Sequence, residues 1–183
     1  MRLRRLEDEL GDRVRVSHRS FLLRPQPDPS RTLDAFRAYT QSWLRPAADP
    51  DGGTFRVWAT DAGPPSHSVP PHLVAKAAAA LGRDAFRAVD ERLFHAYFAE
   101  NRDITDPATL RALWREAGLP DGAFARSADP ALRRATLAEH DEAVARGITA
   151  VPTVVMEGRE GAVVGARPYA DYRRWVARSL ADA

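Results

Sequence analysis

Apolar positions recur at helical spacing over much of the chain, beginning at its first residues. Leu3, Leu6 and Leu10 fall on one face of a predicted helix that ends at Gly11. No Ser, Thr, Asp or Asn precedes this helix, and three arginines lie at its positive end, where basic side chains are unfavourable. The pattern indicates the later turns of a helix that starts further upstream; a genuine start that frays is the alternative.

A period of two replaces the helical period in the next segment. Residues 13–23 alternate side chains, with Val14, Val16 and His18 on one face and polar residues on the other. This alternation, with one polar face, predicts a strand near the edge of a sheet. Three prolines follow and end the predicted strand.

The middle of the chain is predicted to be helical. A helix capped by Ser30 comes first, and a loop rich in Pro, Gly and Asp over residues 45–66 separates it from four further helices. Each of the four has a polar capping residue ahead of an apolar face of helical spacing, namely Ser68, Asp84, Asp106 and Asp129. We therefore expect an α-helical block in this part of the chain.

The last segment changes period again. Val151–Met156 is a short apolar run rich in β-branched residues, Glu157–Gly161 has turn chemistry, and Ala162–Val164 is a second short run. Two such runs around a glycine-containing turn predict a β-hairpin. A final amphipathic helix is predicted to begin at Pro168.

Composition changes this picture mainly through one absence. The 183 residues contain no cysteine, which excludes disulfide scaffolds, cysteine-ligated metals and catalysis by a thiol of this chain. The length and the 44% hydrophobic content are typical of one globular domain, or of a domain with an insertion. No apolar run approaches the roughly 18 residues that cross a bilayer, and the charged start is no secretory signal. We expect a cytoplasmic protein with no membrane partner.

The charge pattern favours an ordinary solvated surface. The net charge is +2, and Lys76 is the only lysine among 27 basic residues. The arginines are interleaved with acidic residues, whereas nucleic-acid binders usually have a basic stripe with aromatic residues. The histidines lack the i, i+4 spacing with a carboxylate that zinc sites use. We therefore expect neither a nucleic-acid partner nor a metal site.

Several strings resemble one family. GITAVPTVVMEGREGAVVGARP near the end, together with the order of elements, resembles the DsbA-like branch of the thioredoxin superfamily, and more closely its FrnE-type group. GDRVRVSHRSFLLRP is similar to the second strand of that family, and LFHAYFAENRDITD to a helix and turn of its insertion. HSVPPH, at His67–His72, lies where such proteins enter the first insertion helix, and Ala150–Thr153 is similar to their Gly-Val-Pro-Thr.

The resemblance covers essentially the whole chain and implies its architecture. It implies an α/β fold in a single domain over residues 1–183, with a thioredoxin-like (DsbA-type) core and a large α-helical insertion. The core would comprise residues 1–28 and 147–183, and the insertion residues 29–146. The first β-strand of the family's core has no counterpart in this chain.

The resemblance also implies a substrate-binding edge. The bond between Val151 and Pro152 would be cis, and the exposed backbone of Val151 would pair with an extended peptide, another thiol or disulfide substrate, or glutathione. The implied binding residues are Ala150, Val151, Pro152 and Thr153, with His72 near the mouth of the groove. The alternative for Pro152 is a trans proline at the start of a strand. The alternative for His72 is a residue in the first turn of a helix that makes a local hydrogen bond.

The chemistry of the family needs a CxxC motif at the start of the first helix, where the helix dipole lowers the pKa of a thiol. This chain has neither that motif nor the first strand. Neighbouring strands lie about 4.8 Å apart, so the loss of a central strand leaves two rows of unpaired backbone groups, each costing roughly 1–3 kcal/mol if buried. Either Met1 lies inside a longer natural protein, or the gap closes by rearrangement, or a second chain, for example in a homodimer, supplies the strand.

These considerations predict a member of a thiol–disulfide oxidoreductase family that is redox-inactive in this form. No catalytic residue is expected in the chain, and no resident cofactor. Two other classes stay open. One is a glutathione-dependent isomerase or transferase of the kappa-type branch, and the other is a non-catalytic module that binds extended peptides.

Overall fold

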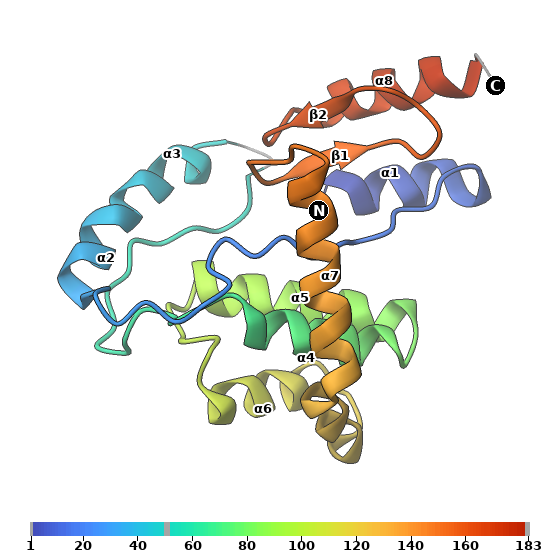
Figure 1. Ribbon diagram of the computed structural model, residues 1–183. Helices are drawn as coiled ribbons and strands as arrows, with labels where there is room; N and C mark the ends of the chain where they lie inside the picture. The colour runs from blue at the N-terminus through green and yellow to red at the C-terminus, as the bar shows by residue number, and fades with distance from the viewer. Residues whose placement is uncertain (1, 50–51, 182–183) are drawn as a thin grey trace. The chain divides into compact units, whose positions relative to one another are not determined.

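The computed structural model describes residues 2–49 and 52–181, and it divides into two compact units (Figure 1). The smaller unit comprises Met1–Phe21 and Asp141–Ala183, and the larger unit comprises Leu22–His140. The core and insertion boundaries at residues 28/29 and 146/147 concern the family architecture and stay a prediction.

The smaller unit is built from a hairpin and two helices. Its elements are α1 (Arg2–Leu10), the 3-10 turn η1 (Gly11–Arg13), β1 (Thr153–Val155), β2 (Ala162–Val164) and α8 (Tyr169–Ala181), together with the end of α7 (Pro130–Ala145). The two strands are antiparallel, and Val154 lies opposite Val163. This arrangement confirms the predicted hairpin and the predicted final helix.

One face of the hairpin is buried. Val154 and Val163 pack against an apolar cluster whose buried members come from α1 and α8, namely Leu6, Tyr169, Tyr172 and Val176. α1 and α8 contact each other in the same unit (Figure 1). Burial of this cluster therefore fixes the hairpin onto the two helices.

The predicted strand over residues 13–23 is wrong. The backbone is extended at Val14, with φ −139° and ψ 129°, but no described strand pairs with this segment. A strand needs a neighbour for its hydrogen-bond ladder, and the described residues form only the two-stranded sheet. The N–H of Val16 instead donates to Oε1 of the buried Glu7, at 2.8 Å. A helix carboxylate thus satisfies an amide that a strand partner would otherwise satisfy.

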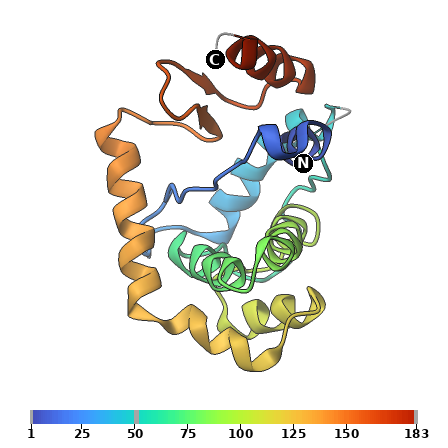
Figure 2. The same ribbon diagram turned by 90° about the vertical axis from the view of Figure 1, so that its right-hand side faces the viewer.

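The larger unit is helical. Its elements are α2 (Leu33–Thr40), η2 (Gln41–Trp43), α3 (Leu44–Ala47), α4 (Val69–Ala79), α5 (Arg83–Phe98), α6 (Pro107–Glu116), η3 (Asp121–Ala128) and most of α7. α4 and α5 pack side by side (Figure 2). They share with α6 a core that contains the fully buried Trp114. A second core is aromatic and is built around Phe36, Trp43 and Trp58. This confirms the predicted helical block.

Two predicted helix caps are confirmed. Oδ2 of Asp106 accepts a hydrogen bond from the N–H of Thr109 at 2.8 Å. Oδ1 of Asp129 accepts one from the N–H of Ala131 at 2.7 Å. Both acidic residues precede a proline at the first helical position, where its missing N–H is not needed.

Two other predicted caps are wrong. Thr32, not Ser30, caps α2, and its Oγ1 accepts from the N–H of Ala35 at 3.2 Å. Ser68 precedes α4, but its Oγ accepts instead from the N–H of Arg24 at 3.0 Å. The N–H of Arg24 thus occupies the hydroxyl that would otherwise accept from the first turn of α4. A contact between residues so far apart cannot be predicted from the local sequence.

Two boundaries also differ from the prediction. α5 begins at Arg83 after Gly82, so Asp84 lies inside its first turn rather than before it. The predicted loop over residues 45–66 begins inside α3, which ends at Ala47. No helix among the described residues is long and apolar enough to cross a membrane.

Asn101 joins the end of α5 to the loop that carries Trp58. Its Oδ1 accepts from the N–H of Ala59 at 2.9 Å, and its Nδ2 donates to the carbonyl of Arg56 at 3.3 Å. It is buried and has a φ of 54°, a conformation that asparagine adopts more readily than most residues. One side chain therefore satisfies two loop groups from a left-handed position.

We expect Asn101→Ala to lower the free energy of unfolding by about 2–3 kcal/mol, because two part-buried hydrogen bonds to the loop are lost and alanine is strained at positive φ. Asn101→Gly loses the same hydrogen bonds without that strain and should be less destabilised. Urea denaturation followed by circular dichroism measures both. An unchanged midpoint for the alanine variant would contradict this account.

Candidate functional site

The site predicted from the sequence lies in the loop before β1. The peptide bond between Val151 and Pro152 is cis, and both residues are exposed. The carbonyl of Pro152 accepts from the N–H of Gly165 at 2.8 Å, which extends the hairpin ladder by one position. The hydroxyl of Thr153 donates to the carbonyl of Ala150 at 2.6 Å. These two bonds fix the loop against the end of β2 and against itself.

The backbone that precedes the proline is open. Thr149, Ala150 and Val151 are all exposed, and none of their N–H groups donates to another residue in the described part of the chain. Exposed backbone donors next to a strand end can pair with an extended ligand in the manner of an added strand. The sequence-predicted residues 150–153 are thus brought together on one loop.

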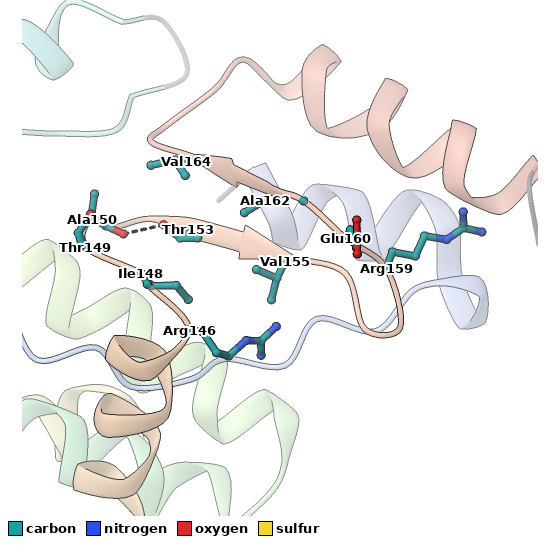
Figure 3. Close-up of a pocket in the computed structure, with 12 residues that line it drawn as sticks. Arg146, Ile148, Thr149, Ala150, Thr153, Val155, Arg159, Glu160, Ala162 and Val164 are labelled. Atoms are coloured by element: carbon teal, nitrogen blue, oxygen red, sulfur yellow. Dashed lines mark hydrogen bonds between the residues drawn. The ribbon is translucent and has the colours of Figure 1, made fainter.

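A cavity of about 410 Å³ adjoins this loop (Figure 3). Side chains alternate along a strand, so the residues next to the partly buried Val154 and Val163 point to the opposite face of the hairpin. That open face supplies part of the cavity lining, namely Thr153, Val155, Ala162 and Val164. The segment that directly follows α7 supplies another part, namely Arg146, Gly147, Ile148, Thr149 and Ala150.

The strand side of the cavity is apolar. Val155 is 38% exposed and Val164 is 49% exposed, and Val151 at the adjoining loop is 43% exposed. Large apolar side chains that stay accessible next to a concave surface are typical of binding sites. The hairpin therefore has one face that packs its own unit and one face open to a ligand.

Two arginines and one glutamate add charge to the lining. Arg146 follows the last residue of α7, and its side chain extends beneath Val155 (Figure 3). Arg159 extends away from the cavity, and its guanidinium donates to the carbonyl of Ser179 at 2.7 Å. Glu160 lies in the hairpin turn. Among the described residues, no group of three His, Asp or Glu side chains is arranged to hold a metal ion.

His72 lies on α4 in the larger unit and does not line the cavity. Burial lowers the pKa of His72, and the neighbouring Lys76 ammonium lowers it further. Lys76 itself forms a largely buried ion pair with Glu139 at 2.7 Å. The assignment of His72 to the site stays a prediction.

Polar contacts reinforce the helices under the hairpin. The hydroxyl of Tyr169 and Nε of Arg173, both on α8, donate to the carboxylate of Glu9 on α1, the latter at 2.6 Å. These hydrogen bonds, that of Tyr169 first, hold the pKa of Glu9 below its ordinary value of 4.5. The guanidinium of Arg5 lies 4.1 Å from the centroid of the Tyr169 ring.

A model of the DSBA-like thioredoxin domain matches residues 1–176. The chain belongs to the DSBA-like thioredoxin family. Among curated proteins no sequence match was found.

Two solved structures share the DSBA-like fold. The cytosolic disulfide reductase DsbM from Pseudomonas aeruginosa superposes with a TM-score of 0.75 at 22% identity, covering 100% of this chain and 91% of DsbM. A protein described as a candidate disulfide isomerase from Nitrosomonas europaea gives 0.71 at 18% identity, covering 86% of this chain and 79% of that protein. These findings confirm the predicted α/β, thioredoxin-like fold with a helical insertion. Membership of the FrnE-type group and a cytoplasmic location stay predictions.

Sequence reasoning on this DSBA-like chain missed the far side of the cavity. Ile148 and Thr149 belong to the string that carries the family resemblance, but neither they nor Arg146 were predicted to bind a ligand, and all three line the cavity. The available signal was their position directly before Ala150–Thr153, because residues that lead into a binding loop often line it. Their side-chain directions depend on how the segment after α7 is placed beside the open face of the hairpin.

We expect Glu9→Gln to destabilise the protein at neutral pH, since it weakens the hydrogen bonds from Tyr169 and Arg173. The pKa of Glu9 is depressed in the folded state, so its contribution is complete above pH 4.5 and is lost as pH falls through the folded-state pKa. Denaturation of both proteins from pH 7 to pH 3.5 should show their difference shrinking in acid. Glu157→Gln, at an exposed turn position, serves as control. A difference that stays constant with pH would contradict the assignment.

Proposed function

We propose that this chain binds an extended polypeptide along the exposed backbone of Thr149–Val151 and does not exchange disulfides through its own side chains. The observation that carries the proposal is the open backbone of these residues beside a cavity with an apolar strand face. In strand addition, main-chain hydrogen bonds supply affinity, and pockets for alternate side chains supply specificity. The exposed backbone of this loop could supply the first, and the adjoining cavity supports the second.

The size of the cavity supports a side chain as its occupant. Its volume of about 410 Å³ lies in the range of roughly 300–1,000 Å³ that ligand pockets span. Val155 and Val164 offer apolar contact to a ligand side chain. The hydroxyl of Thr153 already donates its hydrogen bond to the carbonyl of Ala150. An extended peptide would place alternate side chains into this space while its backbone pairs with the loop.

The chemistry of the family explains why we propose peptide binding without disulfide exchange. Disulfide exchange proceeds by attack of a thiolate on a disulfide sulfur, and the 183 residues contain no cysteine to provide it. The reductase and isomerase with the same fold act on disulfides by their own descriptions. This chain has the open loop and the cavity, so the function proposed for its residues is binding without disulfide exchange.

Strand addition predicts sensitivity to the ligand backbone. A fluorescent, cysteine-free peptide in extended form should bind, and the same peptide with N-methyl groups at alternate residues should bind about twofold to tenfold more weakly. Each lost hydrogen bond is worth roughly 0.5–1.5 kcal/mol. Fluorescence anisotropy measures both affinities. N-methylation of the other alternate set, whose N–H groups face away, is the matched control, and equal affinity for all three peptides would exclude strand addition.

Absence of the thiol predicts absence of turnover. In an insulin reduction assay with dithiothreitol, the chain should not raise the rate above the uncatalysed background. It should also not react with a thiol reagent, either folded or in denaturant. A DsbA-like enzyme that contains CxxC provides the positive control, and turnover by these 183 residues would overturn the proposal.

A further inference from the structure

The cavity is apolar on its strand side and basic where α7 ends, which narrows the class of ligand. We infer that the polypeptide bound at Thr149–Val151 carries an acidic side chain that pairs with Arg146. This inference rests on the proposed function and adds a substrate class to it: extended peptides in which an apolar and an acidic residue lie two positions apart.

Arg146 is well placed to accept such a partner. Its backbone continues the hydrogen bonding of α7, with its N–H donating to the carbonyl of Glu142 at 3.0 Å, so the position of the residue is fixed. Its side chain is 53% exposed and lines the cavity. The planar guanidinium fork matches the geometry of a carboxylate and can bind it through two hydrogen bonds.

The ion pair that Arg146 already makes is weak. The carboxylate of Glu142 lies 3.8 Å from Nη1 of Arg146, and both side chains are about half exposed. The same carboxylate also lies 3.7 Å from Arg19 and is therefore shared. Exposed pairs of this kind contribute little, so a ligand carboxylate can compete with Glu142 for the guanidinium.

The other charges on the cavity do not duplicate this role. Arg159 is directed to the carbonyl of Ser179 and extends away from the cavity (Figure 3). Glu160 would repel a ligand carboxylate. Arg146 thus attracts an acidic side chain of the ligand, and Glu160 repels it. Substitution of each residue alone separates the two effects.

Peptide geometry sets the spacing. Successive side chains of an extended peptide point to opposite faces, so residues two positions apart enter the same cavity. The open face of the hairpin offers Val155 and Val164 to an apolar side chain. A second inward side chain would then lie toward the end of α7, where Arg146 is the basic residue that lines the cavity.

The test is a set of extended peptides that carry Glu, Gln or Lys two residues before or after a valine. Anisotropy at low salt should give affinities in the order Glu, Gln, Lys, with Glu about twofold to fivefold tighter than Gln, as expected for a partly exposed pair. Salt should reduce the preference. Arg146→Gln should abolish it, and Glu160→Gln should increase it.

Arg134→Gln is the matched control, since Arg134 is an exposed arginine within α7 that does not line the cavity. This variant should keep the full preference for Glu. Equal affinity for all peptides, or a preference that survives Arg146→Gln, overturns the inference and leaves peptide binding intact. If no peptide of any charge binds, the proposed function itself has failed.

Discussion

The packing of Val154 and Val163 against α1 and α8 is the interaction on which the smaller unit depends. A two-stranded hairpin alone is marginally stable in water, and each strand here has three residues. Burial of one face of the hairpin therefore supplies stability that its few ladder hydrogen bonds cannot. The hydrogen bond between Pro152 and Gly165 then connects the loop before β1 to this hairpin.

The same alternation that buries one face leaves the other available. Successive side chains of a strand point to opposite faces. Val154 and Val163 face α1 and α8, so their neighbours Val155 and Val164 point to the cavity. Among the described residues, the extended segment after η1 does not add a strand to this hairpin, and the carboxylate of Glu7 accepts from its Val16 amide.

Family membership and chemical capacity are separate properties of this chain. The DSBA-like match runs over residues 1–176, and the fold agrees with that of a disulfide reductase. Thiol–disulfide exchange nevertheless requires sulfur, whereas peptide recognition requires only exposed backbone and a cavity of suitable lining. In the recognition that we propose, Arg146 at one side of that lining supplies a chemical preference without any catalytic group.

The sequence by itself determined the elements whose signals are local. The caps at Asp106 and Asp129, the hairpin with its glycine turn and the Ala150–Thr153 string depend on neighbouring residues. The predicted strand over residues 13–23 was wrong because a period of two describes only side-chain alternation, whereas a strand also needs a neighbouring strand to pair with. Ser68 failed as a cap because a distant amide uses its hydroxyl. Only the tertiary structure decided that the residues after α7 line the same cavity as the open face of the hairpin, because the direction of Arg146 depends on contacts between segments rather than on its neighbours in the chain.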